Sequence, residues 1–313
     1  MAVLRSFQWE KLGQLYKPKA LCEKLQTHAA NPLAIHLQDD VYRIFFSGRD
    51  AQNRSSVGFV DIDILTQSIQ YMHPQPVFEY GAADSFFVHG VSIGCAHYVG
   101  GKTLILFMGW QCPPGEHWRG DIGVLLMENN NSMVLQSSVP YLSTDEIDPL
   151  SLSYPWVVKQ PDNSFMMYYG STLSWESPNG EMIHVINQAS SSDGINWVKH
   201  GLAIPYSLGE AQAFSRPTVF VDKHGHHHMW FSYRSGLGTQ YRIGYASSFD
   251  GRSWELALHQ AGIDVANSGW DSEMIEYPFI FTHKGQIYML YNGNGYGKTG
   301  FGLARLQTKS PLR

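Results

Sequence analysis

Residues 214–254 read FSRPTVFVDKHGHHHMWFSYRSGLGTQYRIGYASSFDGRSW, and this stretch contains the pattern from which the chain is built. Alternating apolar runs, bounded by turn residues, occupy Thr218–Val221, His228–Tyr233 and Tyr241–Ala246. The turn Asp250-Gly251, followed by Trp254, indicates a fourth short strand. Period-two patterning between such turns predicts a four-stranded antiparallel meander. A single sheet of this kind cannot bury both of its faces, so we expect the unit to repeat.

The unit does repeat along the chain. Its first strand contains Pro217, and equivalent prolines stand 61 residues later, at Pro278, and 62 residues earlier, at Pro155. Pro32 lies a further 123 residues back, twice the period, so one more unit is expected near Ser92, where VSIGCAHYVGGKTLILFMGW repeats the strand–turn–strand pattern. Five four-stranded sheets at a regular period predict an all-β, five-bladed β-propeller. The predicted blade openings lie near residues 31, 92, 154, 216 and 277.

The N-terminus indicates how the ring closes. Residues 9–13, WEKLG, repeat the Trp-x-Lys-x-Gly spacing of residues 197–201, which we interpret as following a fourth strand. The last unit, Tyr277–Leu306, shows only three strands. We therefore expect Leu4–Trp9 to supply its missing outer strand, which leaves no open sheet edge. An open solenoid is the alternative, but it does not explain the divided motif. No linker marks a boundary, so residues 1–313 are predicted to form one domain.

Composition narrows the classes of partner and compartment. The chain carries 22 Lys and Arg against 27 Asp and Glu, a net charge of −5 without a basic stripe, which disfavours nucleic acid and anionic membranes as partners. The three cysteines, Cys22, Cys95 and Cys112, are too few and odd in number for a disulfide framework, which fits a reducing compartment. We find no signal-peptide core and no apolar run of membrane-spanning length. A soluble cytoplasmic protein is expected, with its oligomeric state left open.

Propeller topology predicts the face that carries the site. In each blade the first strand follows the central channel and the second returns antiparallel to it, so the start of one and the end of the other share a face. That face gathers Arg, Tyr, Trp, Asn and acidic residues, which suit a polyhydroxylated ligand, because hydroxyls need planar polar partners and sugar rings stack on aromatic ones. The expected substrate-binding residues are Asn31, Arg49, Asp50, His89, Trp110, Tyr154, Arg216, Tyr233, Arg234, Trp270, Tyr277, Asn292 and Asn294.

At this level of detail the chain resembles the five-bladed propeller glycosidases and phosphorylases of glycoside hydrolase families 32, 43 and 130. It is also similar to propellers from bacterial surface-polysaccharide clusters and from plant inositolphosphorylceramide glucosaminyltransferases. The resemblance covers nearly the whole chain and implies an oligosaccharide or glycoconjugate substrate. The residues that show the resemblance are Asn31-Pro32, Ser47-Gly48-Arg49-Asp50, Ser215-Arg216-Pro217, the run Met229–Tyr233, the two Asp-Gly-x-x-Trp turns and Tyr291-Asn292-Gly293.

One departure from that pattern bears on the reaction. Enzymes of families 43 and 32 carry an Asp at the start of the first blade, where this chain has Asn31, and an amide cannot act as a base at neutral pH. Two carboxylates would give hydrolysis, with retention or inversion set by their separation. A family 130-like phosphorylase would instead use one acid, with arginines holding the attacking phosphate. The favoured catalytic acids are Glu210, Asp271, Glu273 and Glu276, which lie on the approaches to first strands.

Several of these residues have a structural interpretation as well. Arg216 and Arg234 could pair with Glu276 or Glu210 as a network that supports the channel. Trp197 and Trp254 are expected to pack between blades. Trp110 and Trp270 lie in loops on the site face and are the better candidates for sugar platforms.

Two further motifs are interpreted as structural. Residues 293–299, GNGYGKT, resemble a phosphate loop but are one residue short and lead into a strand. Residues 224–228, HGHHH, are rich in potential metal ligands but lie at a hairpin tip on the opposite face, where alternation turns neighbouring side chains apart. Adventitious divalent-metal binding is expected there at most, with neither a catalytic metal nor a cofactor.

The sequence thus leaves three functions open. The leading interpretation is an enzyme that hydrolyses or phosphorolyses a glycosidic bond by carboxylate acid/base catalysis. The first alternative is a non-catalytic sugar-binding propeller or an accessory to glycan assembly, which Asn31 in place of an acid favours. The second is a transferase-associated module that acts on a nucleotide sugar or a lipid-linked glycan.

Overall fold

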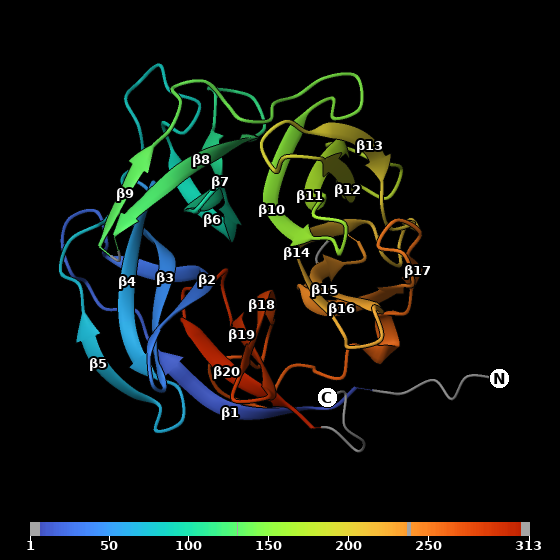
Figure 1. Ribbon diagram of the computed structural model, residues 1–313. Coiled ribbons are helices and arrows are strands. Elements are labelled where there is room, and N and C mark those ends of the chain that lie inside the picture. The colour runs from blue at the N-terminus through green and yellow to red at the C-terminus, as the bar shows by residue number, and fades with distance from the viewer. Residues whose placement is uncertain (1–6, 130, 237–238, 308–313) are drawn as a thin grey trace.

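The computed structural model describes residues 7–129, 131–236 and 239–307, and in them the chain forms the predicted ring of five antiparallel blades (Figure 1). Within these ranges there is no α-helix, and the one helical element is the 3-10 turn η1 (Leu258–Gln260). None of the described segments is a helix of the length and apolarity needed to cross a membrane. Blade I comprises β2 (Thr27–Gln38), β3 (Val41–Arg49), β4 (Ser55–Asp63) and β5 (Ser68–Met72).

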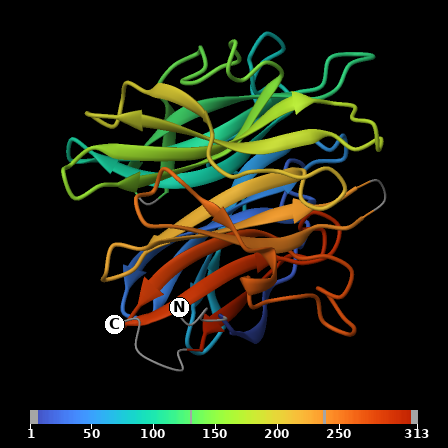
Figure 2. The same cartoon turned by 90° about the vertical axis from the view of Figure 1, so that its right-hand side faces the viewer.

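The other four blades repeat this meander around the central axis. Seen from the side, the strands run through the thickness of the ring and their loops lie at its two faces (Figure 2). Blade II comprises β6 (Gly90–Val99), β7 (Lys102–Gln111), β8 (Arg119–Asn129) and β9 (Ser132–Leu135), and blade III β10 (Ser151–Lys159), β11 (Phe165–Ser174), β12 (Ile183–Ser191) and β13 (Val198–Leu202). Blade IV comprises β14 (Ala213–Val221), β15 (His227–Arg234), β16 (Arg242–Ser248) and β17 (Glu255–Leu256), and blade V β18 (Glu276–His283), β19 (Gln286–Asn292), β20 (Phe301–Leu306) and β1 (Trp9–Tyr16).

The ring is closed by an N-terminal strand, as predicted, although the segment differs from the expected one. β1 pairs antiparallel with β20, from Trp9 opposite Leu306 to Tyr16 opposite Phe301. The strand therefore begins where the predicted segment ends, and residues 4–6 lie outside the described ranges. The repeated Trp-x-Lys-x-Gly motif explains the shift, because its copy in blade III begins at Trp197, directly before β13, and otherwise lies within that strand and not after it. The motif is itself the outer strand in both places.

Neighbouring blades cover both faces of the middle strands, so these strands are buried along their length. In β15 the six residues from His227 to Ser232 are all buried, where a sheet with one wet face would alternate. Aromatic side chains fill the space between blades. Trp254, from the Asp-Gly-x-x-Trp turn of blade IV, meets Tyr168 of blade III edge to face, with ring centroids 5.3 Å apart. Trp197 likewise donates its Nε1–H to the Tyr141 hydroxyl at 3.0 Å.

The first strand of every blade has a register shift, and in four blades this β-bulge contains a proline and shapes the centre of the ring. The ladders shift register at Asn31-Pro32, Tyr154-Pro155, Arg216-Pro217 and Tyr277-Pro278. The residue before each proline has a left-handed backbone, with φ of 56°, 39°, 46° and 52° in that order. Such a conformation costs a bulky residue of the order of 1–3 kcal/mol. The bulge redirects these four side chains at the point where the five blades meet.

Arg216 uses this geometry to connect three blades. Its side chain is fully buried, and its guanidinium donates to the carbonyl oxygens of Ile93 at 2.8 Å and Pro32 at 2.7 Å, with a longer contact to Gly94 at 3.4 Å. The acceptors belong to blades I and II, whereas Arg216 belongs to blade IV. Arg216 therefore supports the centre of the ring through backbone carbonyls, and not through an acidic partner.

Candidate functional site

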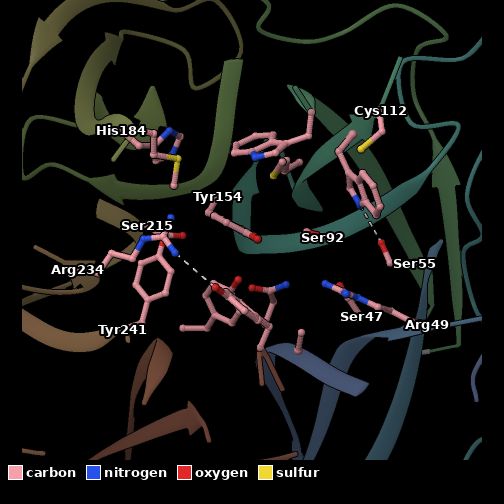
Figure 3. A pocket seen from close by; sticks show the side chains of 18 residues that line it. Ser47, Arg49, Ser55, Ser92, Cys112, Tyr154, His184, Ser215, Arg234 and Tyr241 are labelled. Atoms are coloured by element: carbon pink, nitrogen blue, oxygen red, sulfur yellow. Dashed lines mark hydrogen bonds between the residues drawn. The ribbon is translucent and has the colours of Figure 1, made fainter. Parts of the chain in front are cut away.

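A cavity of about 350 Å³ opens on the face where first strands start and second strands end, the face predicted from the topology. All five blades contribute to its wall. Figure 3 shows Arg234 and Tyr241 on one side, Ser47, Arg49 and Ser55 on the other, and Tyr154 between them. The lining residues are Ala30, Asn31, Ser47, Arg49, Ser55, Ser92, Met108, Trp110, Cys112, Trp118, Tyr154, Met182, His184, Ser215, Arg234, Tyr241, Tyr277 and Tyr296.

Three of the four bulge residues point their side chains to this cavity. Asn31, Tyr154 and Tyr277 line it, and the rings of Tyr154 and Tyr277 lie 5.4 Å apart. The side chain of Asn292 fixes the backbone of Asn31, because its Oδ1 accepts the Asn31 N–H at 2.9 Å. The Oδ1 atom of Asn31 is buried and has no hydrogen-bond partner among the described residues. The strained backbone thus presents unsatisfied polar groups to the space that a ligand would fill.

The wall formed by blades I and II combines a cation with an aromatic platform. The guanidinium of Arg49, at the end of β3, makes no hydrogen bond or ion pair within the described ranges. Trp110 is held by a hydrogen bond from its Nε1–H to Ser55 Oγ at 3.0 Å (Figure 3). His89 stacks on the Trp110 ring at 5.9 Å and accepts the backbone N–H of Cys112 at 3.0 Å. Arg49 is therefore a free cation beside a fixed indole.

The opposite wall holds a second arginine in a fixed position. Arg234, at the end of β15, donates to Glu181 Oε1 at 2.8 Å and lies over the ring of Tyr241 at 5.1 Å. A weaker contact joins it to the Tyr296 hydroxyl at 3.5 Å. The Nε atom of Arg234 is buried and unpartnered in the part of the chain that the structure describes. One N–H group of this guanidinium thus binds Glu181, whereas its Nε–H has no hydrogen-bond partner among the described residues.

His184 is a neutral group in the wall of blade III. It is buried, with Ser153 Oγ 2.8 Å from Nε2 and Thr172 Oγ1 2.7 Å from Nδ1. Burial, together with the nearby charge of Arg234, lowers the pKa of His184 to about 3. Both ring nitrogens are therefore engaged and the ring stays uncharged at neutral pH, so His184 shapes the cavity and is not available as an acid.

Aromatic side chains gather beside the mouth of the cavity. Trp118, which lines it, meets Trp175 edge to face with centroids 4.9 Å apart, and His117 stacks on Trp175 at 4.8 Å. Trp118 and His117 come from the Pro-, Gly- and His-rich loop between β7 and β8. Flat apolar faces with polar edges are the surfaces on which sugar rings stack.

Glu276 is a buried acid that directly precedes the lining residue Tyr277. Its side chain is fully buried, and neither carboxyl oxygen has a hydrogen-bond partner among the described residues. Burial raises the pKa of Glu276 well above its ordinary value, although the charges of Arg49 and Arg234 oppose the shift. Its neighbour Tyr277 lines the cavity, and burial followed by the Glu276 charge raises the pKa of that hydroxyl. Burial therefore favours the protonated form of Glu276 and the neutral form of Tyr277.

The structure brings together only part of the predicted site. Of the expected ligand contacts, six line the cavity: Asn31, Arg49, Trp110, Tyr154, Arg234 and Tyr277. Glu276 lies behind that wall. No Asp or Glu is among the eighteen lining residues that the structure describes. Two of the four favoured acids, Glu210 and Glu273, are exposed and outside the cavity.

The remaining predicted residues have structural partners. Asp271 binds Lys11 Nζ at 2.7 Å and the Tyr291 hydroxyl at 3.0 Å, so it ties the closing strand to blade V. Asp50 accepts Arg54 Nε at 2.8 Å and caps its own turn. Packing or backbone hydrogen bonds account for the others: Trp270 lies on Tyr291, Tyr233 on Phe231, Asn292 donates to Ala29 and Gly300 carbonyls, and Asn294 accepts the Glu273 N–H.

Several lining residues were not predicted, because loops carry them to the wall. Trp118 precedes β8, Tyr241 precedes β16, and Tyr296 belongs to the glycine-rich loop after β19. That loop is the one that resembles a phosphate loop, and its contribution is a tyrosine and not a nest of backbone N–H groups. The sequence signal for Tyr296 is an aromatic residue inside a glycine-rich turn, which indicates a side chain placed for contact with a ligand. Met182 directly precedes β12 and His184 is its second residue, and neither carries a sequence signal of its own.

Comparisons with known proteins agree with this architecture. No protein-family model matches the sequence. Two relatives from Mycobacterium tuberculosis, the uncharacterized proteins Rv1502 of strain H37Rv and MT1551 of strain CDC 1551, are each 42% identical to the chain over 301 residues. Each alignment covers 96% of this chain and 99% of the relative.

Solved structures share the fold at low sequence identity. One comes from work on the GH130 family of mannoside phosphorylases, which contains glycoside hydrolases that target β-1,2 mannosidic linkages in Candida mannan. The match covers 99% of this chain and 97% of the chain in that structure, with a TM-score of 0.74 and 12% sequence identity. The match to an endo-arabinase from Bacteroides thetaiotaomicron covers 92% of this chain and 99% of the endo-arabinase chain, with a TM-score of 0.65 and 11% sequence identity. The chain has the five-bladed propeller fold of these glycosidases and phosphorylases, and it belongs to the same family as Rv1502 and MT1551.

Proposed function

We propose that the protein is a glycoside phosphorylase, which cleaves a glycosidic bond of an oligosaccharide or glycoconjugate with inorganic phosphate as the attacking group. One observation carries the proposal. Arg49 and Arg234 line a cavity whose described wall holds no carboxylate, and a buried carboxyl group with a raised pKa, that of Glu276, directly precedes the lining residue Tyr277. That set suits a reaction with one acid and an anionic nucleophile, and the cytoplasm, which contains phosphate, is the proposed compartment.

Glu276 supplies the proton in this scheme. Tyr277, which lines the cavity, connects Glu276 to the glycosidic oxygen: once a bound ligand brings the hydroxyl and the carboxyl group into hydrogen-bond contact, the hydroxyl passes its proton to that oxygen while it takes the proton of Glu276. A phosphate oxygen attacks the anomeric carbon as the bond from that carbon to the leaving oxygen breaks. The products are a sugar 1-phosphate and the free hydroxyl of the departing group. Glu276 regains its proton from the hydrogen phosphate that was consumed, so protons balance over the cycle.

Arg49 and Arg234 hold the phosphate. Their side chains lie on opposite walls of the cavity (Figure 3), and each guanidinium retains unpaired N–H donors. Charge-assisted hydrogen bonds from Arg to phosphate are about twice as strong as neutral ones and fix the orientation of the oxygens. The same positive charges stabilise the carboxylate that forms when Glu276 gives up its proton, since both lower its pKa. Phosphate binding and acid strength are thereby coupled.

Hydrolysis by two carboxylates fits this cavity less well. It needs a second carboxyl group roughly 5–9.5 Å from the first, as base or nucleophile. Asn31 stands where family 43 and 32 enzymes place that acid, and Glu181 is paired with Arg234. The absence of a carboxylate from the described wall also favours a second candidate, a non-catalytic sugar-binding propeller, in which Trp110, Trp118 and the two arginines bind a glycan without turnover.

The reverse reaction tests the proposal without knowledge of the natural glycan. Purified protein is incubated with glucose, mannose or galactose 1-phosphate and a panel of acceptor sugars, and released phosphate is measured. The forward reaction is then run on oligosaccharides and aryl glycosides with and without phosphate. Phosphate-dependent turnover that Glu276→Gln abolishes and Glu273→Gln retains would support the proposal. Equal turnover without phosphate would assign hydrolysis, and glycan binding without any turnover would assign the non-catalytic candidate.

A further inference from the structure

The hairpin tip of blade IV brings three potential metal ligands together on the face opposite the cavity. Asp222, His226 and His228 place one ligand atom each within 4.8 Å of the others. His226 and His228 are two residues apart on β15 and its approach, so alternation puts them on one side of the strand, and His227 turns to Trp254 on the other. Two histidines of the tip, His226 and His228, therefore lie on the same side, and Asp222 from the preceding turn lies close to both.

We propose that Asp222, His226 and His228 bind a divalent transition metal ion, with Zn²⁺ as the best fit. Zn²⁺ binds imidazole nitrogen and carboxylate oxygen at about 2.0–2.2 Å in a tetrahedron, which separates two ligand atoms by roughly 3.4 Å. Asp222 Oδ2 and His228 Nε2 lie 3.5 Å apart. The third ligand belongs to half-buried His226, whose ring contacts His228 and Phe249 and makes no hydrogen bond within the described ranges, so its rotation towards the other two ligands would break none there. Water would complete the tetrahedron.

The surrounding contacts prepare each ligand for this role. The Tyr245 hydroxyl oxygen lies 2.7 Å from Nδ1 of His228. When that oxygen accepts the Nδ1 proton, Nε2 is left unprotonated towards Asp222, as a metal ligand requires. Asp222 Oδ1 accepts the backbone N–H groups of His224 and His226 at 2.8 and 3.0 Å, which leaves Oδ2 to face His228 Nε2.

The site would brace the closure of the ring. Phe7, just before β1, contacts the ring of His228 edge to face at 5.4 Å and that of Trp230 at 5.0 Å. Trp230 in turn meets Trp9, the first residue of the closing strand, at 5.5 Å. A metal on His228 would fix the ring against which the N-terminal segment packs. The expected role is structural, since the ion would lie on the face away from the cavity.

Metal titration tests the proposal on full-length protein that carries no affinity tag and has been treated with a chelator. Zn²⁺ is titrated at pH 7.5 by calorimetry, and retained zinc is counted after dialysis by elemental analysis. We expect one Zn²⁺ per chain and a rise in Tm with zinc. His226→Gln removes a ligand that makes no hydrogen bond of its own, and it should weaken binding at least tenfold and abolish the rise. His224→Gln, at the exposed tip, is the matched control and should bind as the wild type does.

Two outcomes would overturn the proposal. One is the absence of stoichiometric binding by the wild type. The other is equal zinc affinity in His226→Gln and the wild type, which would mean that zinc binds elsewhere or adventitiously. Tyr245→Phe gives a further check, since loss of the group that orients His228 should reduce affinity by roughly 10- to 100-fold.

Discussion

Replacement of Glu276 by Gln should raise stability at neutral pH and remove activity at the same time. The carboxyl group is fully buried, and burial raises its pKa well above the ordinary value against the opposing charges of Arg49 and Arg234. A raised carboxyl pKa gives its full contribution to stability below the unfolded pKa, about 4.3, and loses it as pH rises towards the folded value. Within that window the unfolded chain binds fewer protons, so unfolding becomes easier with each pH unit. Gln cannot ionise and escapes this loss.

The magnitude follows from proton linkage. Each pH unit inside the window costs about 1.4 kcal/mol. Between pH 5 and pH 7 the wild type should therefore lose up to about 2.7 kcal/mol relative to Glu276→Gln. With an unfolding entropy of about 2.1 cal/mol/K per residue, this corresponds to roughly 4 °C in Tm for a chain of 313 residues.

The assay is the Tm of wild type, Glu276→Gln and Glu273→Gln between pH 5 and pH 8 at constant ionic strength. Glu273 is exposed, so its variant should follow the wild-type profile. Parallel profiles for wild type and Glu276→Gln would refute the reasoning, because they would show that the buried carboxyl is ionised in the folded protein. Phosphorolysis should meanwhile be lost only in Glu276→Gln. Loss of activity in a variant that is more stable separates a functional role from a structural one.

Three further variants probe other parts of the cavity and its support. Arg49→Met should raise KM for phosphate at least tenfold with little change in Tm, because Arg49 has no partner among the described residues; a KM that stays the same would remove Arg49 from the phosphate site. Trp118→Ala should weaken glycan binding in calorimetry and leave phosphate binding unchanged, and unchanged glycan affinity would count against the platform. Arg216→Met should lower the free energy of unfolding by roughly 3 kcal/mol or more, since buried carbonyls of two other blades lose their donor; a near-native denaturation midpoint would contradict that support role.

The fold could be predicted because its signals are local and repeated. Alternating strands, Gly- and Asp-containing turns and a period of about 61 residues are each readable from a single chain, and five copies reinforce one another. The closing strand was placed too early because the Trp-x-Lys-x-Gly motif was assigned to the end of a strand. In the structure its Gly13 and Gly201 lie inside β1 and β13, at irregularities where the register shifts. Glycine at a bulge imitates the glycine of a turn.

The site was harder to predict because its residues come from loops and from behind the wall. Topology located the face, since the ends of paired strands must meet there. It could not separate Glu276 from Glu273, which stand three residues apart, although one is fully buried and the other exposed. Nor could it assign Asp271 to Lys11, because that pair joins residues 260 positions apart across the ring closure. Pairwise chemistry of this kind depends on three-dimensional distance.

The repeated bulge connects the fold with the candidate site. One local rule, a residue with left-handed backbone before a proline, places four side chains at the centre of the ring, and the ring uses them differently. Arg216 satisfies backbone carbonyls and holds three blades together, whereas Asn31, Tyr154 and Tyr277 line the cavity. The strain at each position is fixed by the fold, so substitution there changes chemistry while the backbone stays in place. The first-blade position holds an amide, Asn31, and the acid of the proposed phosphorylase, Glu276, stands directly before the bulge of blade V. If the proposed function holds, one bulge position without a base and one acid beside another suffice for a reaction whose nucleophile is an external anion.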